Sequence, residues 1–306
     1  MADLTIDDNR KLLRYSRLQT LNDCPRKMEL QAAMYEENGG FVSLDTAFGT
    51  AYGAGIAALL VSNNNLFEGY MAALLAWDAD RIPLSTEGGR SLKSFGDCLL
   101  AIEKYHNEVA YLILQDWEVA TLPNGRKAVE TLFVLPLPKG YYASGHIDIC
   151  LKHKRENRFS IREVKTTADP AFHEAKYGKS SQAVGYAAAI GAAYPDAEVE
   201  RMYEVYHTAN REYTCFPLPY GKADAIKWLV GIVAESERIN IYLNYGVFPQ
   251  NGAGCMKFNR ICSMYNFCSD ANTLHPECGV KPVTVKDIDL MLGYTDFVKY
   301  LNTARA

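Results

Sequence analysis

The sequence predicts a mixed α/β fold in which helices flank a central β-sheet, and three kinds of segment carry this prediction. Two segments rich in Ile, Phe and Tyr are separated by a polar run, as expected of neighbouring strands joined by a solvated turn. An Ala-rich segment then begins with Ser and stops at Pro, which is typical of a helix. Further apolar segments on either side complete a mixed sheet of about five strands. The strands are expected at residues 128–137, 142–151, 159–164, 199–208 and 211–220, and the helix at 180–195.

The rest of the chain has mostly helical patterns, with polar and Gly-rich loops between residues 62 and 89. Helices are expected at residues 10–36, 44–62, 69–79, 90–111, 223–245 and 285–304. We find no internal repeat, low-complexity tract or linker, and therefore expect one compact domain spanning residues 1–306. Its parts are a helical N-terminal part (1–115), a sheet core (116–220) and a C-terminal part with helices and cysteines (221–306).

Composition narrows the class of protein. The chain has 306 residues, 48% of them hydrophobic, which is enough for a sizeable core. It contains no run of eighteen apolar residues, so no membrane span is expected. The first residues lack the apolar region of a signal peptide, and we expect a cytoplasmic protein. The net charge of −4 argues against bulk adhesion to nucleic acid, so a nucleic-acid enzyme of this composition would concentrate its positive charge locally.

Two acids and a lysine lie on the central pair of expected strands. Asp148 is near the middle of the first strand, and Glu163 and Lys165 are on the second. Side chains alternate along a strand, so Glu163 and Lys165 face one side while Val164 faces the other. Charged groups beside apolar strands are costly unless neutralised, and a hard cation such as Mg²⁺ would neutralise them through carboxylate oxygens. The alternative is a surface Glu–Lys pair on a half-exposed strand.

A polar pair on the Ala-rich helix adds to this pattern. Gln182 and Tyr186 lie four residues apart and therefore share one helix face. The order of motifs is Gly145-x-x-Asp148, Glu163-x-Lys165 and Gln182-x-x-x-Tyr186. This order resembles the PD-(D/E)XK nuclease superfamily, in particular its RecB-like and Cas4-like branch. The match covers about forty residues.

The resemblance implies a restriction-endonuclease-like sheet and a metal-dependent nuclease. By that resemblance Asp148, Glu163 and the backbone carbonyl of Val164 bind one or two Mg²⁺ or Mn²⁺ ions. Lys165 then positions the nucleophile at the scissile phosphate. Gln182 and Tyr186 would hold the DNA strand or the water network of the site; the alternative is that both are ordinary helix-packing residues.

One motif of the family is incomplete in this sequence. The family's first motif is a G-x-x-x-H helix whose histidine is a further metal ligand. The segment Phe48-Gly49-Thr50-Ala51 resembles its start, but Gly53 stands where the histidine is expected. We expect Glu130, on the strand before Asp148, to replace it, or else to be an edge-strand acid facing water. His106 is the other candidate, although a lone helix histidine is more often packed or solvated.

Eight cysteines in a cytoplasmic chain are not expected to form structural disulfides. Cys255, Cys262 and Cys268 fall within fourteen residues, and Cys24 is near the N-terminus. Four thiolates suit an iron–sulfur cluster or zinc. Cluster-bearing AddB-type and Cas4-type nucleases have one cysteine before the nuclease motifs, in a C-P-R-K phrase, and three after them. Here that phrase is the stretch that begins at Cys24.

By this resemblance the four cysteines bind a [4Fe–4S] cluster that ties the ends of the chain together, with zinc or unligated cysteines as the alternatives. Six residues separate Cys255 from Cys262, where the family often has two. Cys278 is the substitute if one ligand assignment is wrong.

The resemblance implies hydrolysis of DNA phosphodiester bonds, exonucleolytic rather than endonucleolytic, on single-stranded or end-containing DNA. Free-standing relatives of this size are frequent in phage genomes and beside CRISPR loci. No Walker A motif is present, so unwinding would need a helicase or a CRISPR or recombination partner. The sequence leaves the oligomeric state open, and a homo-oligomer is one possibility. The alternatives from other classes are a catalytically silent DNA-binding or assembly subunit that keeps the fold and the thiol site, and a redox iron–sulfur protein.

Overall fold

The computed structural model describes residues 2–33, 43–77, 79, 93–168, 177, 180–257, 260–268 and 281–303. The chain forms two compact units. Unit 1 comprises Met1–Glu37, Leu132–Gly145 and Lys222–Ala306, and unit 2 comprises Asn38–Thr131 and His146–Gly221. Strands β4 (Val129–Leu137) and β5 (Tyr141–His153) contribute residues to both.

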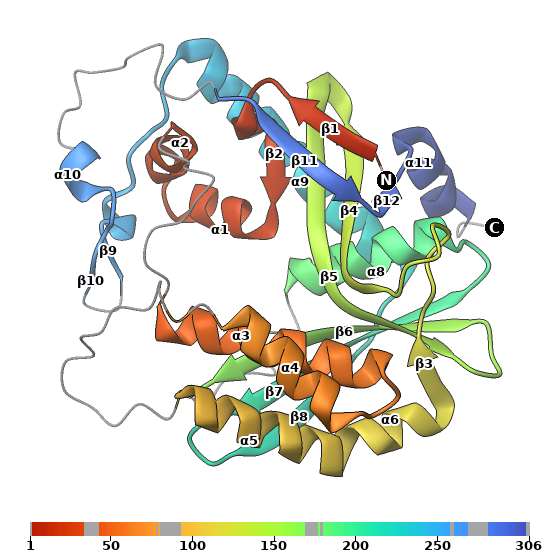
Figure 1. The fold of residues 1–306 in the computed structure, drawn as a ribbon. Helices are drawn as coiled ribbons and strands as arrows, with labels where there is room; N and C mark the ends of the chain where they lie inside the picture. Colours follow the sequence, from red (N-terminus) through yellow and green to blue (C-terminus); the bar gives the residue numbers. More distant parts are fainter. Residues whose placement is uncertain are drawn as a thin grey trace. The chain divides into compact units, whose positions relative to one another are not determined.

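A mixed β-sheet runs through unit 2 (Figure 1). Its strands are β3 (Trp117–Val119), β5, β6 (Arg158–Thr167), β7 (Glu198–His207) and β8 (Glu212–Leu218). β5 pairs with β3 and β6 in antiparallel fashion, β6 with β7 in parallel, and β7 with β8 in antiparallel fashion. A parallel pair requires a long crossover, which here contains helix α8 (Ser181–Ala193). The predicted mixed α/β class, with a mixed central sheet flanked by helices, is confirmed.

Helices before the sheet strands complete unit 2. They are α3 (Leu44–Val61), α4 (Leu66–Ala76), α5 (Phe95–Tyr105), the π-helical turn η3 (His106–Ala110) and α6 (Tyr111–Asp116). Side-chain oxygens of Ser43, Asn65 and Ser94 accept backbone N–H groups at the starts of α3, α4 and α5. These caps set the helix starts. The helices predicted at 69–79 and 90–111 therefore begin at Leu66 (α4) and Phe95 (α5) instead.

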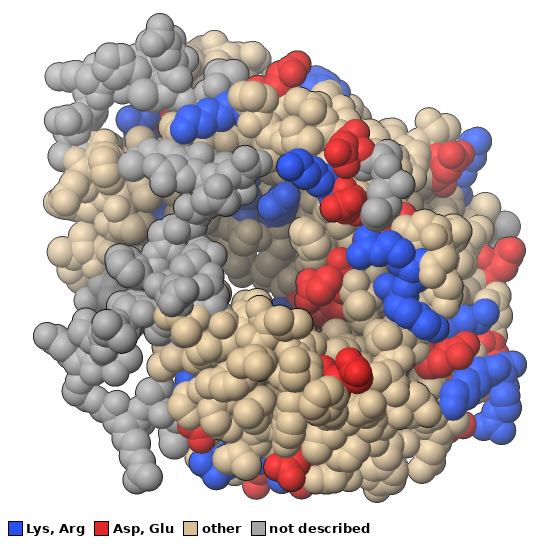
Figure 2. Space-filling model, viewed as in Figure 1, with Lys and Arg blue, Asp and Glu red and all other residues tan. Residues whose placement is uncertain are grey.

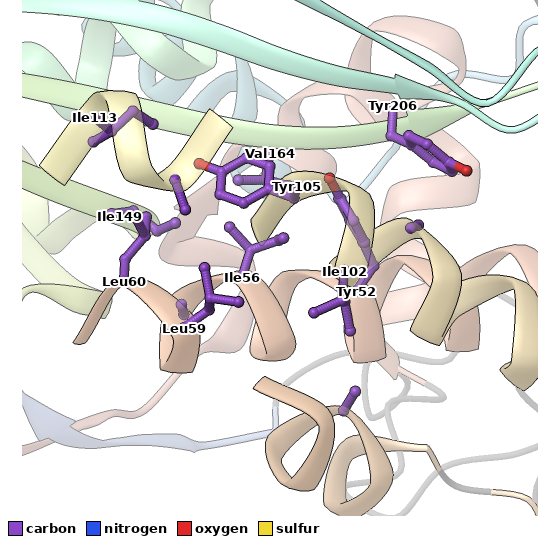
Figure 3. Packing of buried hydrophobic residues seen from close by; sticks show 14 of the residues in the cluster. Tyr52, Ile56, Leu59, Leu60, Ile102, Tyr105, Ile113, Ile149, Val164 and Tyr206 are labelled. Atoms are coloured by element: carbon purple, nitrogen blue, oxygen red, sulfur yellow. The ribbon is translucent and has the colours of Figure 1, made fainter. Parts of the chain in front are cut away.

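The main core of unit 2 lies between these helices and one face of the sheet (Figure 3). Ile56 of α3, Tyr105 of α5 and Val164 of β6 belong to it, together with Ile149 of β5. α3 is eighteen residues long and apolar enough by length and composition to cross a membrane, but half of it is buried within the protein. This burial is the behaviour of a core helix.

The α3 and α4 helices approach closely through two glycines. A Cβ placed on Gly55 would overlap Ile102 Cδ1 and lie 3.1 Å from the Gly69 carbonyl oxygen. A Cβ on Gly69 would lie 3.2 Å from the Gly55 carbonyl oxygen. The outer face of α4 exposes Phe67 and Leu75, and Figure 2 shows a mostly uncharged surface there.

A charged group is buried beneath the sheet of unit 2. Glu204 of β7 accepts hydrogen bonds from Arg162 Nη1 at 3.1 Å and from the Tyr105 hydroxyl at 2.7 Å. Both oxygens of this carboxylate are therefore satisfied, as a buried charge requires.

Unit 1 contains the chain termini and two small sheets in addition to its parts of β4 and β5. Its helices are α1 (Tyr15–Asp23), α2 (Pro25–Ala33), α9 (Lys222–Tyr245), α10 (Tyr265–Cys268) and α11 (Tyr294–Asn302), with 3₁₀ turns η1 (Asn9–Lys11), η4 (Pro138–Gly140) and η5 (Gly252–Gly254). Its further strands are β1 (Ala2–Ile6), β2 (Leu12–Arg14), β9 (Met256–Lys257), β10 (Arg260–Ile261), β11 (Val283–Ile288) and β12 (Leu290–Met291). β1 pairs with β11, β9 with β10, β12 with β4 and β2 with β5.

The predicted bounds of two helices in this unit are wrong. The first, over residues 10–36, is interrupted because Pro25 lacks an N–H and disfavours helical backbone before it; Cys24 has φ −163° and ψ 112°. The last, over 285–304, begins only at Tyr294, because Val283–Ile288 forms β11 against β1. Val and Thr alternate in β11, which suits a strand.

Candidate functional site

The antiparallel pairing of β5 with β6 brings the first acid to the second strand. Ile149 pairs with Arg162, so Asp148 lies beside the stretch that begins at Glu163. The backbone N–H of Val164 donates to Asp148 Oδ2 at 2.9 Å. This bond fixes the carboxylate of Asp148 against β6.

Glu163 and Lys165 lie on the same face of β6. The Lys165 Nζ contacts Glu163 Oε1 and lies 3.9 Å from Asp148 Oδ2. Val164 points to the opposite face, where it packs in the core described above (Figure 3). The ammonium therefore bridges two carboxylates from neighbouring strands.

The carboxylates hold their protons more tightly than usual. Glu163 is 0% exposed, and its burial, together with the charge of Asp148, raises its pKa to about 8, against the opposing effect of Lys165. Burial also raises the pKa of Asp148, while Lys165 and the Val164 N–H oppose it. The two carboxylates raise the pKa of Lys165 against the effect of its own burial. We infer that the lysine stays protonated, while at neutral pH and without a cation Glu163 keeps its proton.

Glu163 has an unsatisfied oxygen. Its Oε2 is buried and has no hydrogen-bond partner among the described residues. A buried carboxylate oxygen without a donor carries a substantial desolvation cost. A cation or a water molecule at this oxygen would remove that cost.

Glu130 belongs to the same electrostatic group. Part of the Glu130 residue is exposed to water. Nearby protein atoms nevertheless remove part of the hydration of its carboxyl group, and this raises its pKa to about 7. Asp148 adds to this shift and Lys165 opposes it. Its φ of 46° is unusual for a residue with a side chain and marks local backbone strain. The site thus has three carboxylates for one ammonium.

Helix α8 brings the amide and the phenol to the site. Gln182 Nε2 donates to the Tyr186 hydroxyl at 3.0 Å, as expected of residues on one helix face. Burial raises the pKa of the Tyr186 phenol, and the charges of Glu163 and Asp148 raise it further. Tyr186 therefore lies within the electrostatic range of both acids.

Two other candidates have different surroundings. His106 lies on the π-helical turn, where its Nδ1 is 2.9 Å from Asn64 Oδ1. A Cβ on Gly53, on α3, would meet no atom of the described residues within 4 Å, apart from the helix's own backbone and the two chain neighbours. Space for a side chain exists at Gly53, but no ligand atom stands there.

The donor set of this acidic group fits a hard divalent cation. Carboxylate oxygens are the ligands that Mg²⁺ and Mn²⁺ prefer, and Glu163 Oε2 lacks a hydrogen-bond partner among the residues that the structure describes. Within the part of the chain that the structure describes, no group of three or more His, Cys, Asp or Glu side chains is arranged to hold a metal ion.

All four cysteines singled out by the sequence line one pocket of unit 1. Its volume is about 200 Å³, and Cys24, Cys255, Cys262 and Cys268 are among its lining residues. Cys24 and Cys255 each act to raise the pKa of the Cys268 thiol, after the larger effect of its burial. Gln250 Nε2 approaches Cys268 Sγ at 3.2 Å. Cys278 lies outside the described residues.

Contacts between distant parts of the chain hold together the two segments that line the pocket. Asn251 Nδ2 donates to the Asp23 carbonyl at 2.9 Å, and the Arg26 N–H donates to the Pro249 carbonyl at 3.1 Å. A Cβ on Gly254 would lie 2.8 Å from the Asp23 carbonyl oxygen, so glycine is needed there. Four thiols around one pocket are the donor chemistry that an iron–sulfur cluster requires. The described cysteines are not arranged around a single ion.

Comparisons with known proteins add little. No family model matches the chain, and no curated protein matches it. Among solved structures, the crystal structure of SSO0001 is similar at 11% identity and a TM-score of 0.28, with 72% of this chain and 86% of that chain covered. A likeness at this level supports no statement about fold or function.

Proposed function

We propose that this protein is a metal-dependent DNA nuclease of the restriction-endonuclease-like fold, with a RecB-like and Cas4-like site. The observation that carries the proposal is the meeting of Asp148, Glu163 and Lys165 on adjacent strands, with Glu163 Oε2 buried and without a hydrogen-bond partner in the described part of the chain. Three carboxyl groups surround one ammonium, so their full ionisation gives more negative charge than Lys165 neutralises, and a bound cation would compensate it.

The residues have distinct roles in this proposal. Asp148, Glu163 and the carbonyl of Val164 hold Mg²⁺ or Mn²⁺, and Glu130 takes the place left by the glycine at position 53. A divalent cation there supplies a Lewis acid for the phosphate and lowers the pKa of a bound water. Lys165 remains an ammonium, because carboxylates raise its pKa, and donates to a phosphate oxygen or to the attacking water.

Gln182 and Tyr186 complete the site. The Gln182 amide donates to the Tyr186 hydroxyl and keeps its own oxygen for a water or a sugar-phosphate group. Tyr186 keeps its proton at neutral pH, because burial and the nearby acids raise its pKa. Both side chains are thus suited to hold DNA or water by hydrogen bonds.

The thiol pocket is proposed to bind a [4Fe–4S] cluster through Cys24, Cys255, Cys262 and Cys268, with zinc as the alternative. The support is that all four thiols line one pocket. The cluster would be structural, holding the segment at Cys24 to the segment from Gln250 to Cys268. The substrate is single-stranded or end-containing DNA, and the setting is the cytoplasm, with a helicase or a CRISPR or recombination complex as partner.

A second candidate function is a catalytically silent DNA-binding or assembly subunit. The observation that favours it is Gly53, which offers no ligand atom where the family has histidine. It differs from the first proposal only in turnover, so activity separates them.

The test is degradation of end-labelled single-stranded DNA with Mn²⁺, for the natural chain, Lys165→Ala and Lys227→Ala. Lys227 is the matched control, because it is an exposed lysine of α9 paired with Asp224. We expect a loss of about 100-fold or more for Lys165→Ala, of the order seen for loss of one charge-stabilising donor, and none for the control. Equal and negligible turnover of all three would favour the silent subunit.

A further inference from the structure

Tyr203 is the direct neighbour of the buried acid in the sheet. In the parallel pairing of β6 with β7, Glu163 is opposite Tyr203. Paired residues of adjacent strands point to the same face, so Tyr203 stands on the face that carries Glu163 and Lys165. α8 covers this face, since its Ala183 packs with Tyr203 in one cluster.

The Tyr203 hydroxyl is bonded to the start of α8. It donates to Ser180 Oγ at 2.8 Å, and Ser180 Oγ in turn accepts the backbone N–H of Gln182 at 3.3 Å. Arg201, two residues before Tyr203 on the same face, approaches the Ser180 carbonyl with Nη1 at 3.5 Å and donates to the Pro219 carbonyl at 3.1 Å. Strand β7 thus contacts the hydroxyl and the carbonyl of Ser180.

We propose that Tyr203 is a positioning residue: its hydroxyl, through Ser180, sets the N-terminal turn of α8 so that Gln182 and Tyr186 face the Glu163–Lys165 pair. This proposal rests on the proposed nuclease function and goes beyond it, because Tyr203 belongs to none of the motifs that suggested that function. Tyr203 touches neither DNA nor metal in this scheme. Its proposed effect on the site runs through α8.

The hydroxyl is the informative part of Tyr203. The side chain is 1% exposed, and its ring stacks on Tyr177 with centroids 4.4 Å apart. A phenylalanine would fill this space and avoid the cost of burying a hydroxyl. Ser180 can cap α8 without Tyr203, since the cap needs only the Gln182 N–H. The Tyr203–Ser180 bond therefore adds a fixed link between β7 and α8.

The link between β7 and α8 matters because the first turns of α8 contain Gln182 and Tyr186. Gln182 is two residues after Ser180 and bonds to Tyr186, whose phenol lies in the field of Glu163 and Asp148. A small tilt or rotation of this turn moves both side chains relative to the acids. Misplacement by about 1 Å can cost about 100-fold in rate.

The first experiment compares the kinetics of Tyr203→Phe and Tyr206→Phe. Tyr206 is the matched control, because it is on the same strand but faces the other side, stacked on Tyr52 at 5.7 Å. With Mn²⁺ and single-stranded DNA we expect kcat of Tyr203→Phe to fall between about tenfold and about 100-fold, with KM changed less than about twofold. Ser180→Ala should match it, and Ser180→Thr, which keeps a hydroxyl, should restore most of kcat.

The second experiment does not depend on activity. Amide hydrogen exchange in a peptide spanning residues 181–193 should be about tenfold faster in Tyr203→Phe and unchanged in Tyr206→Phe, because one buried hydrogen bond to the helix start is lost. Unchanged exchange and unchanged kcat in Tyr203→Phe would overturn the proposal. If the natural chain does not degrade DNA, the nuclease function fails, while exchange still decides whether Tyr203 holds α8.

Discussion

The carboxylate of Glu163 has its two oxygens in different situations: Oε1 contacts the Lys165 ammonium, while Oε2 is buried and has no hydrogen-bond partner among the described residues. The two residues are separated by Val164, so the strand period of two brings them to one face. A single lysine cannot neutralise Glu163, Asp148 and Glu130 together. This imbalance is the physical basis for expecting a cation, and it makes the stability of the protein depend on pH.

Without added metal, we expect the free energy of unfolding to fall as pH rises. Folding raises the pKa of Glu163 from its ordinary 4.5 to about 8, so the folded state binds this proton more tightly than the unfolded chain. The resulting stability is complete below about pH 4.5 and is lost as pH rises through about 8, on the order of 5 kcal/mol. Asp148 shifts in the same direction.

Urea unfolding between about pH 5 and about pH 8.5 measures this slope. Glu163→Gln should flatten it, whereas Glu212→Gln, at an exposed position of β8, should leave it unchanged. Mn²⁺ should stabilise the natural chain most at the upper end, because carboxylate ligands must be deprotonated. A slope shared by the natural chain and Glu163→Gln would contradict the assignment.

Two glycines of α3 should respond to alanine in opposite ways. Gly53 has open space around it, so Gly53→Ala should stabilise the protein by about 0.5–1 kcal/mol through helix propensity. Gly55→Ala should destabilise it by about 1–3 kcal/mol, because the new Cβ would overlap Ile102. Chemical denaturation of both variants checks the prediction, and a stable Gly55→Ala protein would mean that the two helices are less tightly packed than the structure has them.

The buried pair of Arg162 and Glu204 should be costly to break. Arg162→Met leaves the Glu204 carboxylate without its cation, and we expect a loss of about 3–5 kcal/mol in unfolding free energy. Lys104→Met is the comparison, since Lys104 and Glu108 form an exposed pair on a helical surface, worth less than about 1 kcal/mol. Similar losses for the two variants would show that Glu204 reaches water or another partner.

The thiol pocket gives a spectroscopic prediction. Anaerobically purified protein should show a broad absorption band near roughly 400 nm from thiolate–iron charge transfer. Serine at any one of Cys24, Cys255, Cys262 or Cys268 should weaken or abolish it, whereas Cys215→Ser, at an exposed cysteine of β8, should retain it. A colourless protein containing zinc would select the alternative metal.

The sequence predicted the central strands and α8 well, because their alternation and their Ser and Pro boundaries are local signals. It missed β1 and β2 and turned β11 into a helix. β1 pairs with β11 across almost the whole chain, and β2 has only three residues. Pairings of this kind are determined by tertiary contacts that no local window contains.

In the candidate site, too, some features follow from local sequence signals and others depend on tertiary contacts. The same-face placement of Glu163 and Lys165 follows from strand period, and that of Gln182 and Tyr186 follows from helix period. Tyr203 was missed because its importance depends on the parallel register that sets it opposite Glu163. Arg162 was missed as a core residue because its partner, Glu204, is 42 positions later. The position of Tyr203 opposite Glu163 follows only from the pairing of β6 with β7 in the folded structure.

The contact between Asn251 and Asp23 joins positions 228 residues apart. A ribosome adds roughly 5–20 residues per second, so α1 and α2 emerge roughly 10–45 s before the segment that holds them. Most of unit 2 is translated in that interval. These native neighbours of α1 and α2 therefore become available only after unit 2 has been synthesised.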